Sequence, residues 1–398
     1  MELRLDIFQT MALVTVVFYL GTYFRKRVGF LSKYCIPAPV IGGLLFALVM
    51  LFLKITNLAT ITLDTTLQNL FMTTFFASVG FTASFKILKN GGIKLAMFLG
   101  IAILLIISQD IVGATLAKVF QLNPLLGLCT GSISMIGGHG TSGSFGPLLE
   151  ELDVSGATTV SFASATFGLV MGSFIGGFVA KNLIENYKIK TPKESQDKSI
   201  PLSDFHEDNQ AILCHHKLMK ASAYLFFAMG VGSIISKFIQ DTGLTFPSYI
   251  GAMIAAAIIR NVCDIRKQEI EEKEIEVIGN ISLSYFLCIA LMGLRLWELF
   301  DLALPLVVML VAQSLLMAIF AYFITFRAMG KDYDAAVFAS ASCGFGMGAT
   351  PNAVANMDAL SAKFGFAATP YFVVPIVGAL FVDFVNSAVI TLFINILM

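Results

Sequence analysis

Long stretches without charge are the feature that most constrains this chain. Cutting the sequence at its charged residues leaves twelve stretches that are uncharged or nearly so. Many could cross the hydrocarbon core of a bilayer, about 30 Å thick, as a helix. Charged residues make up only 13% of the chain and hydrophobic residues 57%, whereas a soluble domain is about a quarter charged. The sequence therefore predicts an all-α polytopic membrane protein in a lipid bilayer, and its net charge of zero argues against nucleic acid as a partner.

Two glycine-rich segments interrupt the apolar sequence, at residues 137–147 (GGHGTSGSFGP) and 343–356 (CGFGMGATPNAVAN). Irregular backbone at membrane depth is tolerated only where protein buries it or where it lines a watery cavity. The two segments occupy matching places in the two halves of the chain. A duplicated pair of breaks of this kind points to the binding site of a secondary transporter.

The chain divides into two halves that resemble each other. The polar stretch 181–220 separates residues 1–180 from residues 221–398, and each half contains six apolar stretches. FFASVGFTASF in the first half parallels FLCIALMGLRLWEL in the second, and a glutamine (Gln109, Gln313) precedes each glycine-rich segment. We interpret the halves as two inverted-topology repeats of five transmembrane helices, joined by a polar cytoplasmic linker.

The distribution of lysine and arginine favours re-entrant hairpins over further spans. Basic residues concentrate on the cytoplasmic side of membrane proteins. If all twelve stretches span and the N-terminus is outside, 10 of the 26 basic residues are cytoplasmic; if the glycine-rich segments are hairpins, at about 125–149 and 335–357, the number becomes 21. Five spans per half invert the second half, so the hairpins enter from opposite faces. The central loop is then cytoplasmic and both termini are external.

Soluble-enzyme interpretations of the same residues are weak. The GxGxxG spacing from Gly138 to Gly143 lacks the strand and the βαβ unit of a dinucleotide site. His139 and Ser142 could act as a base and a nucleophile, but no orienting acid is near in sequence. The six cysteines stand singly, without metal-type spacing, and fit packing roles. We therefore expect no enzyme and no cofactor.

Several motifs resemble those of the bacterial sodium–glutamate symporter family, over nearly the whole chain. They are IPAPVIGGL, GSISMIGGHGTSGS, ATFGLVMG, NISLSYFLCIALMGLRLWEL, MGKDYDAA and CGFGMGATPNAVANM. The resemblance implies a multi-pass, homodimeric carrier in the bacterial inner membrane. It also implies sodium-coupled uptake of L-glutamate by an elevator-type alternating-access mechanism, with Na⁺ as the coupling ion, ten spans and two opposed re-entrant loops.

The two glycine-rich breaks carry the expected substrate-binding residues. Breaks in a helix expose backbone N–H and C=O groups, and the N-termini of half-helices favour a carboxylate. The alternative is that the glycines only let each hairpin turn and pack closely. The expected substrate-binding set is Gly138, His139, Gly140, Thr141, Ser142, Gly346, Gly348, Thr350, Asn352 and Asp383.

Sodium is a hard cation, so its site should consist of oxygen atoms from carbonyls, hydroxyls, amides and at most a carboxylate. For each serine or threonine, the alternative is an intrahelical bond to a backbone carbonyl. The expected sodium ligands are Ser78, Ser134, Thr141, Asn352, Asn356 and Asp383.

Two acidic residues lie within predicted spans, where a carboxylate is costly and usually functional. Asp383 is mid-span and is expected to bind a cation or the substrate's ammonium group; a structural bond to a neighbouring helix is the alternative. Asp110 falls toward the end of its helix, so a solvated interfacial position fits equally well. His139 suggests proton coupling, or a hydrogen-bonded structural role.

The spans are expected to divide into a fixed part and a moving part. Spans 1–2 and 6–7 are expected to form a scaffold, and the remainder with both hairpins to move. Gly168, Gly172 and Gly176 recur every fourth residue, which permits close packing against a hairpin or a sliding surface. The rival functions are a dicarboxylate or hydroxy-acid carrier, with or without proton coupling, and an ion channel.

Overall fold

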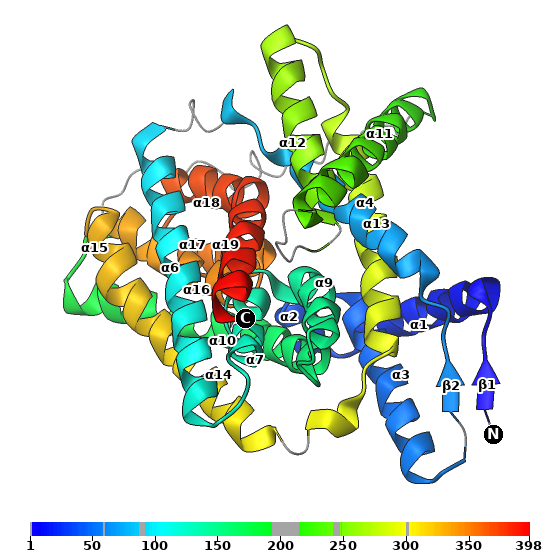
Figure 1. Cartoon of the computed structure of the whole chain (residues 1–398). Helices are drawn as coiled ribbons and strands as arrows, with labels where there is room; N and C mark the ends of the chain where they lie inside the picture. The colour runs from blue at the N-terminus through cyan, green and yellow to red at the C-terminus, as the bar shows by residue number, and fades with distance from the viewer. Residues whose placement is uncertain are drawn as a thin grey trace.

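The computed structural model describes residues 2–58, 60–86, 92–192, 215–241, 247, 249–299 and 302–398. Nearly all of these residues are helical (Figure 1). Much of the predicted linker, residues 193–214, lies outside the described residues.

Within the described residues, seven helical segments are long and apolar enough to cross a membrane. They are α1 (Ile7–Arg27), α3 (Ala38–Ile55), α6 (Gly92–Val119), α10 (Ala157–Asn186), α11 (His215–Gln240), α13 (Glu272–Met292) and Ala303–Ala328. The last comprises α14 (Ala303–Ile319), a π-helical stretch η3 (Phe320–Thr325) and α15 (Phe326–Ala328). An eighth is formed if α18 (Ala368–Leu380) and α19 (Val382–Leu397), bent by 47°, count as one broken span.

Two further helices occupy the places of the remaining expected spans. α4 (Thr66–Thr82) has 17 residues, slightly short for a span. α12 (Tyr249–Arg266) has 18 residues but carries Arg260, Asp264 and Arg266 in its last two turns. The expected count of ten spans therefore stays a prediction.

Large apolar side chains cover the outer faces of the spans. Phe8 on α1, Phe238 on α11 and Leu304 on α14 are each at least 72% exposed. Apolar faces of this extent mark surfaces that another apolar medium covers, and the helices that carry them are long enough to cross a bilayer. The chain is thus a multi-pass membrane protein.

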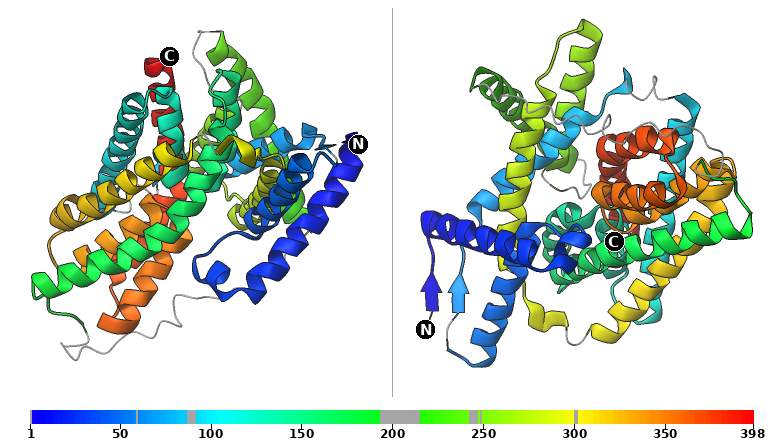
Figure 2. Two further views of the ribbon diagram at one scale, coloured as in Figure 1. Left: turned by 90° about the horizontal axis from the view of Figure 1, so that it is seen from below. Right: turned by 180° about the vertical axis from the view of Figure 1, so that it is seen from behind.

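The helices pack in two groups (Figures 1 and 2). The first group consists of α1, α3, α4, α11, α12 and α13, which pack mainly on one another. The second consists of α6, α10, α14 to α19 and three short helices, α7 (Pro124–Thr130), α8 (Ser132–Met135) and α9 (Gly138–Glu151). Its members α16 (Tyr333–Gly346) and α17 (Thr350–Phe364) contain the second glycine-rich segment. The packing places α4 and α13, spans 3 and 8 of the sequence, beside the expected scaffold rather than apart from it.

One small sheet departs from the all-α expectation. β1 (Glu2–Arg4) pairs in parallel with β2 (Thr60–Thr62), and Asp6 caps the start of α1 just after β1. Neither three-residue segment has an alternating apolar pattern long enough to predict a strand. The remaining connections of the first group include the short helices α2 (Gly29–Lys33) and η2 (Leu296–Leu299).

The glycine face of α10 packs against the second glycine-rich segment rather than against the hairpin of its own half. A Cβ atom at Gly168 would lie 2.2 Å from the carbonyl oxygen of Met347, and one at Gly172 would lie 2.7 Å from that of Cys343. A Cβ atom at Gly176 would lie 2.2 Å from Nδ2 of Asn356. The absence of side chains along this face lets α10 touch the backbone of α16 and the break after it.

We expect Gly168→Ala to destabilise the folded protein, because the added methyl meets a backbone carbonyl that cannot rotate away. Overpacking of this kind costs about 1–3 kcal/mol. Gly177→Ala on the same helix is the matched control, since nothing lies within 4 Å of a Cβ atom there. Thermal melting in detergent should fall for Gly168→Ala and hold or rise for Gly177→Ala. Equal melting of the two variants would contradict the packing seen here.

Candidate functional site

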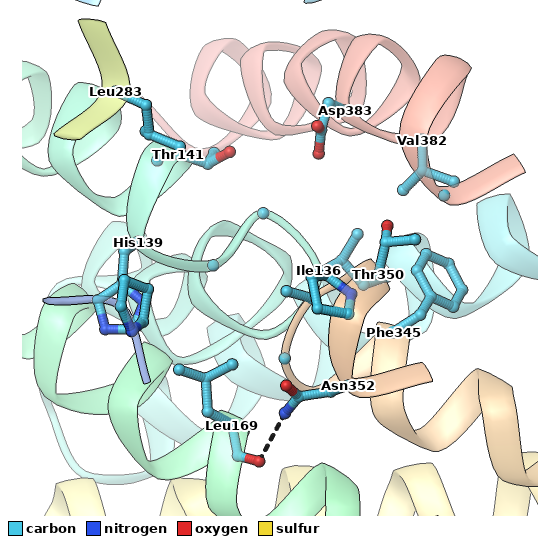
Figure 3. A pocket seen from close by; sticks show the side chains of 18 of the residues that line it. Ile136, His139, Thr141, Leu169, Leu283, Phe345, Thr350, Asn352, Val382 and Asp383 are labelled. Atoms are coloured by element: carbon cyan, nitrogen blue, oxygen red, sulfur yellow. Dashed lines mark hydrogen bonds between the residues drawn. The ribbon is translucent and has the colours of Figure 1, made fainter. Parts of the chain in front are cut away.

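The two glycine-rich segments line one cavity of about 290 Å³ (Figure 3). Residues 136–141 at the start of α9 form one side, and residues 348–352 at the start of α17 form another. Further lining residues come from α4, α13, the break between α18 and α19, α10, α16 and the connection before α3. The cavity therefore lies where the two helix groups meet.

Helix α6 shows that the two segments reach the cavity from opposite ends. α7 follows directly on the C-terminal end of α6. α16 begins beside the other end, where Lys94 lies 3.9 Å from Asp334. Both chains then run toward the middle of α6: Asp110 contacts the start of α8, and the side-chain amide of Gln109 donates to the carbonyl of Gly346 at 2.7 Å.

The two breaks almost touch. Gly138 has φ +58°, a left-handed conformation that glycine adopts at little cost. A Cβ atom at Gly138 would lie 3.1 Å from the carbonyl oxygen of Gly348. The sequence folds this way because small residues at both tips let backbone approach backbone.

Three helices begin at the cavity wall, and the first N–H groups of a helix have no partner within it. α9 has 14 residues, α17 has 15 and α19 has 16, and each has lining residues in its first turn. No side-chain cap bonds to the first turn of any of the three. The N-terminal ends of helices carry partial positive charge and bind anions.

Asp383 is the acidic residue of the cavity. It lies in the first turn of α19, and its carboxylate points into the space between Thr141 and Thr350 (Figure 3). None of the described residues forms a hydrogen bond or ion pair with this carboxylate. The prediction that Asp383 serves a cation or an ammonium group thus has a suitable geometry, and the alternative of a bond to a neighbouring helix is not seen among the described residues.

Asn352 has one atom engaged and one free. Its Nδ2 donates to the carbonyl of Leu169 on α10 at 2.8 Å (Figure 3). Its Oδ1 is buried without a hydrogen-bond partner among the described residues. An unpaired buried oxygen beside a cavity is suited to accept a bond from an ammonium group or to bind a cation.

Most of the predicted substrate-binding residues share this cavity. The eight that line it are Gly138, His139, Gly140, Thr141, Gly348, Thr350, Asn352 and Asp383. Ser142 does not, because its hydroxyl donates to the carbonyl oxygens of Gly138 and Ser161. Gly346 lies behind the tip, where its carbonyl accepts from Gln109. The ligand roles of the eight stay predictions.

The predicted sodium ligands divide in the same way. Thr141, Asn352 and Asp383 line the cavity. Ser78 lines the neighbouring cavity and donates to the carbonyl of Phe75. Ser134 and Asn356 reach neither cavity.

Both of these outlying residues bond to backbone. Ser134 lies 3.4 Å from the carbonyl of Gly131, and Asn356 donates to the carbonyls of Gly172 and Ser340. Their geometry fits the structural alternatives better than the role of cation ligand.

Two further polar residues have structural partners. Nε2 of His139 lies 3.1 Å from the hydroxyl of Thr166, as expected for a hydrogen-bonded residue in a tight turn. Asp110 is fully buried rather than interfacial, and it accepts from the N–H and the hydroxyl of Ser132. It thereby fixes the start of the first hairpin's break.

Sequence reasoning missed the apolar wall and the broken last span. Phe75 and Phe76 from α4 and Leu283 and Leu287 from α13 line the cavity. Their sequence looks like ordinary membrane-facing residues, so no signal distinguished them. The prediction of ten spans assumes that the last one is continuous, whereas α18 and α19 are bent by 47°; Pro375 and Gly378 shortly before Asp383 are the sequence signals of this interruption.

Sequence similarity to known proteins extends over nearly the whole chain. The sodium/glutamate symporter family model matches residues 3–366. The chain belongs to this family. It is 40% identical over 393 residues to the sodium/glutamate symporter of Escherichia coli (strain K12), covering 98% of each chain. It is 37% identical to that of Haemophilus influenzae, covering 98% of this chain and 97% of the relative. These family members are named as transporters and not as enzymes.

Asp383→Asn and Asp110→Asn should separate a ligand role from a structural one. Asp383→Asn should fold normally, because no bond to a described residue is lost, and should lose the thermal stabilisation that sodium gives. Asp110→Asn should melt at lower temperature with or without sodium, because it weakens two buried bonds to Ser132, each contributing about 1.5–3 kcal/mol. Melting curves in sodium and in potassium test both. Unchanged sodium stabilisation in Asp383→Asn would remove that residue from the site.

Proposed function

We propose that this chain takes up L-glutamate together with sodium. The observation that carries the proposal is the cavity between the two glycine-rich breaks, where the unpaired carboxylate of Asp383 in α19 faces the first turns of α9 and α17. The names of its relatives in two bacteria support the same substrate and ion.

An amino acid dicarboxylate fits the charges of this cavity. Its ammonium group would bind the Asp383 carboxylate and Oδ1 of Asn352. A carboxylate would accept bonds from backbone N–H groups at the starts of α9 and α17. A cavity of about 290 Å³ is near the lower end of the range for small-molecule sites, which suits a metabolite of this size.

Sodium is cargo at the same place in this proposal. Thr141, Asn352 and Asp383 each offer an oxygen atom at the cavity, and oxygen ligands suit a hard cation. An anionic substrate and a cation that share one cavity stabilise each other, so binding of one raises the affinity for the other. That reciprocity is the physical basis of coupling.

The two helix groups support an elevator-type movement. The group of α6 to α10 with α14 to α19 holds both breaks, and it meets the other group at the cavity. We propose that the hairpins α7–α9 and α16–α17 enter the membrane from opposite faces. Sliding of their group past α4 and α13 would then expose the cavity to each side in turn.

The same proposal places ten spans in a bacterial inner membrane, with both termini outside and the central linker in the cytoplasm. The inward concentration of lysine and arginine supports this orientation. A homodimer follows from the family resemblance and stays a prediction.

The rival substrates fit less well. A dicarboxylate or hydroxy acid lacks the ammonium group, so Asp383 would repel it. Proton coupling through His139 is disfavoured because Thr166 already engages its ring.

Uptake into proteoliposomes tests the function. An inward sodium gradient should drive accumulation of radiolabelled L-glutamate above its external concentration, and a potassium gradient should not. Unlabelled succinate or malate should compete weakly. Uptake that ignores sodium, or that succinate blocks as well as glutamate does, would contradict the proposal.

Opposite entry of the hairpins predicts opposite labelling. Glu151 ends α9 and Lys363 lies near the end of α17, and both are exposed. In a background without native cysteines, an impermeant thiol reagent should modify Glu151→Cys from outside intact cells and Lys363→Cys only from the cytoplasmic side. Labelling of both from one side would contradict the inverted arrangement.

A further inference from the structure

A second cavity, of about 360 Å³, adjoins the first and carries a buried arginine. The two cavities share Phe75, Thr350, Gly378 and Asp383. The second is otherwise lined by α4, α12 and α13, including Arg260. Arg260 is the one lysine or arginine that lines either cavity within the described residues.

Arg260 forms ion pairs with two carboxylates, one of which is largely buried and the other exposed. Its Nε lies 3.2 Å from Oδ2 of Asp264, one turn along α12, and the hydroxyl of Ser84 also donates to that oxygen. Its Nη1 lies 2.5 Å from Oε1 of Glu272 on α13. The arginine and Asp264 side chains are only 9% and 16% exposed, whereas that of Glu272 is 62% exposed.

This difference in burial identifies the replaceable partner. Asp264 accepts from two donors, Nε of Arg260 one turn earlier on α12 and the hydroxyl of Ser84 in the connection that follows α4. Glu272 lies in the first turn of α13 with most of its side chain in open space, so it can rotate away at little cost. The guanidinium of Arg260 is held in position by Asp264. It can therefore bind another carboxylate in the place of Glu272 when Glu272 rotates away.

The second cavity also continues toward the surface. A third cavity, of about 510 Å³, shares Arg260 and Glu272 with it and is lined by Lys86 and Lys267. All three basic residues belong to the side that we propose to be cytoplasmic. An anion that passes between the first cavity and this surface therefore meets Arg260 on its way.

We propose that Arg260 binds a carboxylate of the transported amino acid in the second cavity, and that Glu272 occupies this place when substrate is absent. The inference rests on the proposed function. It makes Arg260 a specificity residue, because the helix termini and Asp383 treat the main-chain groups of all amino acids alike. A fixed guanidinium on the route favours a side-chain carboxylate over the isosteric amide of glutamine.

The test compares sodium-driven glutamate uptake, and its inhibition by glutamine, in four variants. Arg260→Gln should raise the KM for glutamate at least tenfold while inhibition by glutamine changes less than twofold. Arg260→Lys should keep a clear preference for glutamate. Glu272→Gln should lower the KM for glutamate, because it removes the competing carboxylate. Arg266→Gln, exposed on the same helix and outside all three cavities, is the matched control and should behave as wild type.

Opposite changes in the KM for glutamate in Arg260→Gln and Glu272→Gln distinguish substrate binding by Arg260 from a purely structural ion pair. If the ion pair only braces α12 against α13, both variants should impair transport together, and that result would overturn the inference. An unchanged ratio of glutamate to glutamine affinity in Arg260→Gln would also overturn it, and the ratio does not depend on how much protein folds. Absence of sodium-driven uptake in the wild type would instead contradict the proposed function.

Discussion

Broken backbone inside the membrane has to find hydrogen-bond partners, and the rest of this structure depends on how it does so. Side-chain amides supply the donors. Gln109 donates to the carbonyl of Gly346 at 2.7 Å and Asn386 to that of Ser132 at 3.2 Å. Asn352, in the second break, donates to the carbonyl of Leu169 within the continuous helix α10 at 2.8 Å. Asp110 supplies the acceptor for the N–H of Ser132. Because lipid offers no such partners, the two breaks are confined to the place where these side chains meet.

The amides also connect the two halves of the chain. Gln109 reaches from the first half to the second hairpin, and Asn386 reaches from the second half to the first. Gln313 donates to the backbone of Gln109 at 2.8 Å. Each glycine-rich break is therefore bonded to a helix from the other half of the chain. The group that carries the cavity is bonded within itself, whereas its boundary with α4 and α13 is formed largely by apolar side chains such as Phe75 and Leu283. One buried polar contact between the two groups joins the hydroxyls of Ser144 on α9 and Tyr249 on α12, which are 3.4 Å apart.

The sequence predicted the parts of this architecture that depend on local chemistry. Charge-free length predicted spans, and paired glycines predicted the two breaks. It located Asp383, because a mid-span carboxylate has few uses. It did not separate Thr141, which lines the cavity, from Ser134 and Ser142, which bond to backbone. The difference lies in which way each side chain points within a short broken helix, and tertiary packing sets that direction. Arg260 was predicted only as one of the cytoplasmic basic residues, because a basic residue near a helix end is explained by the orientation of the protein in the membrane.

The side-chain amides that donate to backbone also have an oxygen atom each, and these oxygens matter for the cavity. Gln109, Gln313, Asn352 and Asn386 each use the nitrogen for backbone, and in each the side-chain oxygen is buried without a partner among the described residues. An unsatisfied buried acceptor costs about 1–3 kcal/mol. Only Asn352 among the four lines the cavity, so only there can a bound ligand remove the cost. A ligand that donates to or coordinates Oδ1 of Asn352 would therefore remove a cost that arises from the bond between its Nδ2 and the carbonyl of Leu169.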